Sequence, residues 1–134
     1  MGIVEWDESF AIGVDIVDTQ HRELFRVINS FHQRIGAEDD AFALRVALDS
    51  LKNYVTYHFG TEEKLLARGG CPELAQHQGA HAAFTALVGR YEASRDDADG
   101  EDLLRLQDFL VGWLVSHIRD EDLRLKEYFL AGNT

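Results

Sequence analysis

Hydrophobic residues recur at helical spacing over most of the chain that follows residue 18. Positions three or four apart lie on one face of an α-helix, so this repeat predicts amphipathic helices that bury one face. Breaks at Gly36, at Gly69 and Gly70, and in the acidic stretch 95–100 divide the repeat into four parts. The pattern therefore predicts helices over about 18–35, 40–68, 72–94 and 101–129.

Residues that favour helix ends agree with these boundaries. Asp18 is a favourable N-cap for the first helix, and Asp39 and Asp40 precede the second. Pro72, the only proline, suits the first position of the third helix, where its missing N–H has no helical partner to lose. Four helices joined by short connections predict an all-α, up-down-up-down four-helix bundle.

The first 17 residues show a different pattern. Alternate positions from Phe10 to Ile16 are apolar, and this period of two indicates extended chain. No second run of this kind follows, and a single strand has no partner for its backbone. We therefore expect residues 1–17 to form an extended arm across the bundle, anchored by Trp6 and Phe10.

Length, charge and cysteine content narrow the class of protein. The 134 residues suit one domain, and no linker or repeat divides residues 1–134. The formal net charge of -11 disfavours nucleic acid and anionic membrane surfaces as partners, and no surface pattern predicts a protein partner. The single cysteine, Cys71, excludes an internal disulfide. Because neither a secretory signal nor a membrane-spanning run is visible, we expect a cytoplasmic protein.

Histidines supply the candidate chemistry. Five of the six fall on the predicted inward faces of four different helices: His21, His58, His77, His81 and His117. A single buried histidine is usually a hydrogen-bonded core residue. Five neutral imidazoles in one small core would leave many ring nitrogens unpaired, because the same faces carry few neutral polar side chains. The sixth, His32, is expected at the surface or behind the site.

Two of the predicted helices carry pairs of ligand types one turn apart. His77 and His81 offer two imidazoles from one face, and His58 and Glu62 offer an imidazole and a carboxylate from another. A helical bundle brings such pairs together across its core. With the two remaining inward histidines there are six ligands, enough for one octahedral ion, whereas a seventh would suit two ions bridged by carboxylates.

Two acidic residues compete for the seventh position. On a straight helix Glu121, four residues after His117, lies on the same face, whereas Asp122 is rotated by about 140°. Spacing alone therefore favours Glu121.

Together these motifs resemble the hemerythrin family, in particular the bacterial hemerythrins. The similarity covers nearly the whole chain and consists of Trp6, Gly13, Asp18-x-x-His21-x-x-Leu24-Phe25, His58-Phe59-x-x-Glu62-Glu63, His77-x-x-x-His81 and His117-Ile118-x-x-x-Asp122. In that family the carboxylate five residues after the last histidine bridges the metal ions. The resemblance thus implies Asp122 in place of Glu121, a local distortion of the helix, and a solvent-side position for Glu121.

The resemblance also implies a cofactor of two iron ions joined by an oxo or hydroxo bridge. It assigns His77, His81 and His117 to one iron, His21 and His58 to the other, and Glu62 and Asp122 to both. The second iron then lacks one ligand, and dioxygen binds at that vacancy in the family. The implied partner is dioxygen. The implied function is its reversible binding, for storage, delivery or sensing, rather than catalysis.

Bulky apolar residues flank the expected ligands and would wall a dry pocket around the open iron: Leu24, Phe59, Trp113, Leu114 and Ile118. Ordinary core packing also places apolar residues there, and both roles can hold. Two other functions stay open. One is a diiron peroxidase or oxidase that uses the same ligands, which the lack of a further inward acid or base disfavours. The other is an interaction bundle stabilised by zinc, although a closed zinc site uses four ligands rather than seven.

Overall fold

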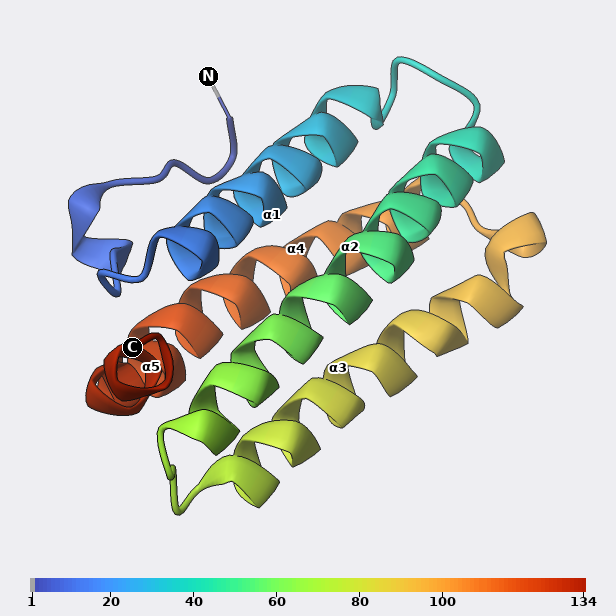
Figure 1. The fold of residues 1–134 in the computed structure, drawn as a ribbon. Coiled ribbons are helices and arrows are strands. Elements are labelled where there is room, and N and C mark those ends of the chain that lie inside the picture. The colour runs from blue at the N-terminus through green and yellow to red at the C-terminus, as the bar shows by residue number, and fades with distance from the viewer. Residues whose placement is uncertain (1) are drawn as a thin grey trace.

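The computed structural model describes residues 2–134, and within this range it contains helices and no strand. Four long helices run alternately up and down the molecule (Figure 1): α1 (Asp15–Arg34), α2 (Asp40–Arg68), α3 (Leu74–Ala93) and α4 (Gly100–Ser116). The helix predicted over 101–129 is not continuous. After α4 it is replaced by a π-helical turn, η3 (His117–Asp122), a 3₁₀ turn, η4 (Leu123–Leu125), and a short helix, α5 (Lys126–Gly132). The predicted all-α, up-down-up-down bundle is confirmed. No helix in the described range is long and apolar enough to cross a membrane.

The N-terminal arm packs against α1 through aromatic rings, as predicted. Phe10 is buried, and its ring centroid lies 5.7 Å from that of Trp6 and 5.0 Å from that of Phe25. The arm is not a strand, because it contains a short 3₁₀ turn, η1 (Glu8–Phe10). Aromatic packing and hydrogen bonds between the Val4 backbone and the Asn29 side chain hold the arm against α1.

The first helix begins three residues earlier than predicted. Asp18 does not cap α1; Val14 occupies that position. The Asp18 carboxylate instead accepts hydrogen bonds from the backbone N–H groups of Ile12 (2.8 Å) and Gly13 (3.1 Å). Gly13 has a φ of 96°, a conformation that favours glycine and turns the arm into the helix. Asp18 thus serves the arm rather than the start of the helix.

The third helix begins later than predicted. Pro72 lies in the turn before α3, which starts at Leu74, so proline is not its first residue. The turn is held by a hydrogen bond from the Cys71 N–H to the Leu66 carbonyl at 3.0 Å. The Cys71 side chain is buried among apolar neighbours, which agrees with a packing role.

The core consists of two apolar clusters separated by a polar layer. On α1, Val17 belongs to one cluster, Leu24 belongs to the other, and the buried His21 lies between them. Two other segments cross the same three layers in the reverse order. On α2 these residues are Phe59, Glu62 and Leu65, and after α4 they are Ile118, Asp122 and Leu125. Apolar packing therefore encloses this layer on both sides.

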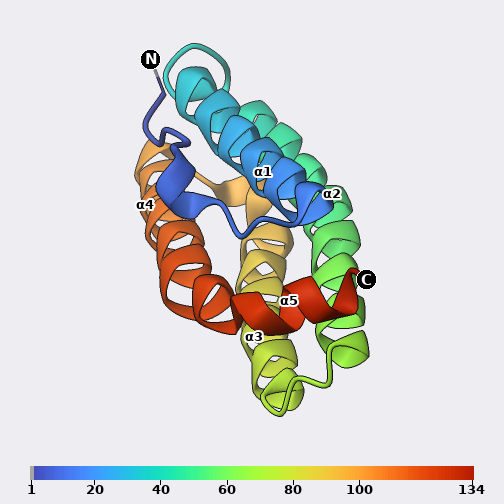
Figure 2. The same ribbon diagram turned by 60° about the vertical axis from the view of Figure 1, so that its left-hand side comes forward.

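The short helix α5 crosses the end of the bundle next to α2 (Figure 2). Two glycines permit this close approach. A Cβ atom on Gly132 would overlap the backbone carbonyl of Leu65, and one on Gly69 would overlap that of Tyr128. Backbone contact at these two points holds α5 against α2.

Candidate metal centre

Seven ionisable side chains meet in the polar layer: His21, His58, Glu62, His77, His81, His117 and Asp122. They come from α1, α2, α3 and η3, and none is more than 3% exposed. The structure thus brings together all seven residues that the sequence and the resemblance nominated.

The Glu62 carboxylate directs its two oxygens toward different histidines. Oε2 lies 3.0 Å from Nε2 of His21 and 3.3 Å from Nε2 of His58. Oε1 lies 3.1 Å from Nε2 of His81, and it is 3.6 Å from the Nε2 atoms of His77 and His117. One carboxylate therefore faces two groups of imidazoles.

The Asp122 carboxylate repeats this division. Oδ2 lies 3.2 Å from Nε2 of His21, whereas Oδ1 lies 3.1 Å from Nε2 of His77 and 3.3 Å from Nε2 of His117. The histidines thus form a two-member group and a three-member group, which we call the two-histidine group (His21 and His58) and the three-histidine group (His77, His81 and His117).

Several buried polar atoms in this layer lack a hydrogen bond of acceptable geometry. They are Nε2 of His58, Nε2 of His77, Oε1 of Glu62 and both carboxylate oxygens of Asp122. Nε2 of His81 also lies 3.1 Å from Nε2 of His117. Unsatisfied buried polar atoms are costly, and a cation between them would satisfy all at once. Imidazole and carboxylate donors suit first-row transition metals, so these residues fit a pair of metal ions.

In the absence of metal, protons compensate the charge of the carboxylates. Burial opposes the charged form of His21, but the adjacent Asp122 and Glu62 outweigh it and raise the pKa of His21 to about 9. The same balance raises the pKa of His77 to about 9 and that of His117 to about 10. These are sites where a metal ion would replace protons.

The π-helical turn η3 explains how Asp122 reaches the layer. A π-helix closes its hydrogen bonds between residues five apart, so the fifth residue after His117 returns to the same face. Glu121 is half-buried rather than wholly on the solvent side, which corrects the expectation for this residue. Its Oε2 accepts a hydrogen bond from Nδ1 of His117 at 2.6 Å.

Two further residues contact the histidines, and neither was expected to do so from the sequence. Nδ1 of His58 donates to Oε1 of Gln20 at 2.8 Å, and Nδ1 of His81 donates to Oε2 of Glu63 at 2.8 Å. Both pairs join different helices, so helical spacing gives no signal for them. His32 is exposed, as expected, and its Nδ1 donates to Gln107.

Residues 12–129 match the model of a protein family described as the hemerythrin HHE cation binding domain. This range covers all seven residues of the polar layer and most of the chain. The chain belongs to the hemerythrin family. Among the described residues, its cluster of buried histidines and carboxylates could hold a metal ion.

Named members of the hemerythrin family are similar over most of this chain. A bacteriohemerythrin from Stenotrophomonas maltophilia is 31% identical over 126 residues, which is 91% of this chain and 78% of that protein. A bacteriohemerythrin from Clostridium acetobutylicum is 30% identical and covers 87% of this chain and 94% of its own. A myohemerythrin from Riftia pachyptila is 32% identical, over 90% of this chain and 89% of its own.

Solved structures support the fold of this hemerythrin-family chain. The crystal structure of a hemerythrin mutant superposes with a TM-score of 0.83 and covers 100% of both chains. Its sequence identity is 23%, so this likeness shows the fold alone.

Aromatic rings cover the three-histidine group of this hemerythrin-family centre. The Phe59 ring stacks on the His81 imidazole, with centroids 3.8 Å apart and planes 4° apart. The Trp113 ring stacks on the His117 imidazole at 4.5 Å and 12°. Two residues of the expected oxygen pocket therefore lie against the three-histidine group.

Three of the expected pocket residues line a small cavity in the larger apolar cluster: Leu24, Trp113 and Leu114. Its volume is about 10 Å³, and all eight residues that line it are apolar. Ile118 is fully buried in the same cluster. The interior next to the polar layer is thus apolar and tightly packed, as a water-excluding wall requires.

Proposed function

We propose that this chain is a non-haem diiron protein that binds dioxygen reversibly, for storage, delivery or sensing. The observation that carries the proposal is the division of the two buried carboxylates. Glu62 and Asp122 each direct one oxygen toward the two-histidine group and the other toward the three-histidine group. Two carboxylates arranged in this way suit two metal ions that they bridge.

The two metal positions would differ in their number of protein donors. The three-histidine position has three imidazoles and one oxygen from each carboxylate, which makes five. The two-histidine position has two imidazoles and one oxygen from each carboxylate, which makes four. The position held by His21 and His58 would therefore be the one open to an external ligand.

Iron at these two positions would supply the two electrons that reversible binding of dioxygen requires. The residues of the chain hold and shield that site. Leu24, Leu114 and Ile118 are buried beside the polar layer and exclude water, and exclusion of water strengthens electrostatic interactions inside the site. In this proposal Phe59 and Trp113 limit access to His81 and His117.

The names of the relatives support the assignment of iron and dioxygen, because they are bacteriohemerythrins and a myohemerythrin. A diiron peroxidase or oxidase is the second candidate function. Apart from the ligands, the acidic side chains that contact the centre, Glu63 and Glu121, lie behind His81 and His117. Both of these acids are bonded to the three-histidine group and not to His21 or His58, so reversible binding of dioxygen is favoured over catalysis.

The proposal is tested by quantifying iron per chain after reconstitution, followed by anaerobic reduction and titration with dioxygen. We expect two irons per chain and a visible charge-transfer band that appears with oxygen and disappears under argon. Iron well below two per chain would overturn the diiron assignment. Rapid autoxidation with peroxide-dependent turnover of a reductant would instead indicate the enzyme.

A further inference from the structure

The outer nitrogens of the site histidines are paired unequally. In the three-histidine group, Nδ1 of His81 donates to the Glu63 carboxylate at 2.8 Å. His117 makes the same kind of bond to Glu121 at 2.6 Å. In the two-histidine group, Nδ1 of His58 donates instead to the neutral amide oxygen of a glutamine at 2.8 Å. The two groups therefore receive different electrostatic support.

The second member of the two-histidine group has no acidic partner behind it either. Nδ1 of His21 is buried, and within residues 2–134 it has no hydrogen-bond partner. A carboxylate that accepts from Nδ1 makes the opposite Nε2 a stronger metal donor, whereas a neutral acceptor fixes the same tautomer with a weaker effect. His21 and His58 should therefore donate less electron density to a bound metal ion than the histidines of the three-histidine group do.

Gln20 supports His58 in only one orientation of its amide. With the amide oxygen toward Nδ1, His58 carries its proton there and presents a free Nε2 lone pair to the site. With the NH₂ group in that place, His58 would carry its proton on Nε2, where a metal ion has to bind. The direction of one amide group thus decides whether this histidine is a ligand.

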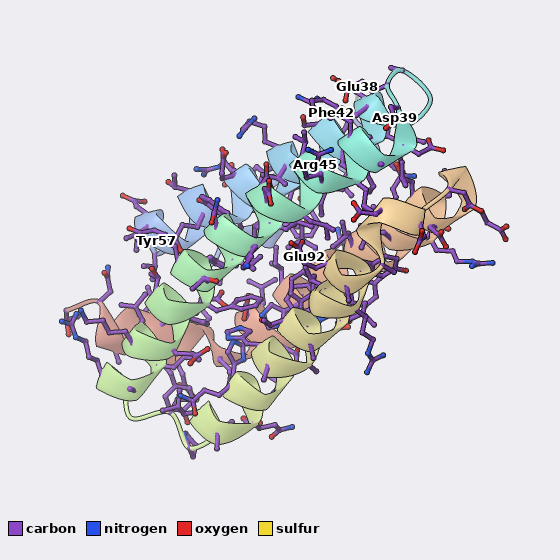
Figure 3. The ribbon with its side chains drawn as sticks, turned by 90° about the vertical axis from the view of Figure 1, so that its right-hand side faces the viewer. Glu38, Asp39, Phe42, Arg45, Tyr57 and Glu92 are labelled. Atoms are coloured by element: carbon purple, nitrogen blue, oxygen red, sulfur yellow. The ribbon has the colours of Figure 1, made fainter. Side chains whose placement is uncertain are left out.

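Thr61 sets that direction. Its hydroxyl donates to the backbone carbonyl of Tyr57 at 3.1 Å, which leaves an oxygen lone pair to accept from Nε2 of Gln20 at 3.2 Å. The Gln20 oxygen then faces His58. Because Gln20 is only 3% exposed, water does not compete for its amide. The chain of bonds begins on the outer side of α2, where Tyr57 is exposed (Figure 3).

We propose that Gln20, oriented by Thr61, is a positioning residue that holds His58 in its metal-binding tautomer. Because its amide is neutral, it also leaves the two-histidine group a weaker electron donor than the three-histidine group. This inference rests on the proposed diiron function and assigns it two further residues. A weaker donor set favours the ferrous over the ferric state. The open position would therefore be the more easily reduced one, which suits a site that must return to the ferrous state.

Four variants test the inference in the full chain. Gln20→Leu removes the acceptor, Gln20→Glu replaces the amide with a carboxylate, and Thr61→Val removes the hydroxyl that orients the amide. Thr56→Val is the matched control, because Thr56 lies on the same helix and also donates to a carbonyl one turn earlier, that of Lys52, at 2.8 Å. Circular dichroism checks that each variant is helical.

The readouts are iron(II) affinity in competition with a chelator and the midpoint potential of the reconstituted protein. Gln20→Leu should lose about 10–100-fold in affinity at one of the two positions, and Thr61→Val should lose less at the same position. Gln20→Glu should retain both irons with a lower midpoint potential. A tenfold preference for the ferric state corresponds to a shift of about 59 mV for one electron. Thr56→Val should behave as the wild type.

Wild-type affinity at both positions in Gln20→Leu, or an unchanged or higher potential in Gln20→Glu, would overturn the inference. If Gln20→Leu does not fold, Gln20→Glu and Thr61→Val decide the question, because both change polarity with little change of volume. Failure of the wild type to hold two irons would overturn the proposed function itself, and this inference with it.

Discussion

At the scale of single residues, the centre depends on two fully buried carboxylates whose surroundings are mainly imidazole. Burial raises the pKa of Glu62, but the nearby histidines, led by His58, outweigh it and hold that pKa well below its ordinary value. Asp122 is equally buried and makes close contacts with His21, His77 and His117. Glu62 is therefore held in its charged form, and the loss of either carboxylate leaves histidines without their acidic partner.

Asp122 and its neighbour Glu121 provide a direct comparison. Asp122→Ala removes the oxygens that face both histidine groups, so we expect the variant to bind fewer than two irons per chain. Glu121→Ala removes only the acceptor behind His117 and should retain two irons with about 10–100-fold weaker affinity. Iron per chain under limiting and saturating iron measures the difference. Two tightly bound irons in Asp122→Ala would contradict a bridging role.

Leu114 tests the apolar wall. Leu114→Ala enlarges a cavity that is now about 10 Å³ and should cost about 2–5 kcal/mol in the free energy of unfolding. We expect this variant to keep both irons but to autoxidise faster, because water reaches the site. Leu104→Ala is the control, since Leu104 lies on the same helix and is 50% exposed. Equal autoxidation rates in the wild type and in Leu114→Ala would speak against the pocket assignment.

At the scale of elements, the π-helical turn η3 fixes the last carboxylate. It inserts one residue relative to a regular helix, and so it brings Asp122 rather than Glu121 onto the face of His117. The segment that follows keeps Leu125 and Phe129 in the smaller apolar cluster. The extra residue therefore serves the site without disturbing the packing below it.

A deletion tests this account of η3. Removing Asp120, which is exposed, should convert the turn to regular α-helix and place the same aspartate four residues after His117. We expect this variant to retain iron. Removal of the exposed Gly112 from α4 instead shifts the register of His117 relative to the helix before it, and should abolish binding. Iron per chain and helicity are the measurements, and loss of iron in both deletions would show that η3 has another role.

The elements also show which parts of the site were predictable. The five inward histidines and Glu62 could be predicted as ligands from the sequence, because hydrophobic periodicity shows which face of a helix is buried. Asp122 required the resemblance, since spacing pointed to Glu121. Gln20 and Glu63 act through contacts between helices, which periodicity does not report. Asp18 was misassigned because an aspartate before a helical run resembles an N-cap, whereas its carboxylate caps the arm.

At the scale of the whole molecule, two apolar clusters enclose a layer of charge that a metal ion or protons must balance. Without metal, His21, His77 and His117 have pKa values raised from 6.5 to about 9 or 10. Their contribution to stability is fully present below about pH 6.5 and is lost as pH rises through these folded-state values. Burial lowers the pKa of His58, so this residue makes the folded state more stable as pH rises.

We therefore predict that the metal-free protein becomes less stable between about pH 6.5 and about pH 9. Thermal unfolding midpoints of metal-free samples across this range measure the effect. The iron-loaded protein is the control, because its imidazoles are bound to metal rather than to protons and should show little change there. A midpoint of the metal-free protein that rises with pH over this range would contradict the prediction.

The most direct test of the central claim is anomalous X-ray scattering at the iron edge, measured on crystals of the reconstituted chain. We predict two iron peaks, one beside His77, His81 and His117 and the other beside His21 and His58, with the same two carboxylates contacting both. A single peak, or two peaks that Glu62 and Asp122 do not join, would contradict it.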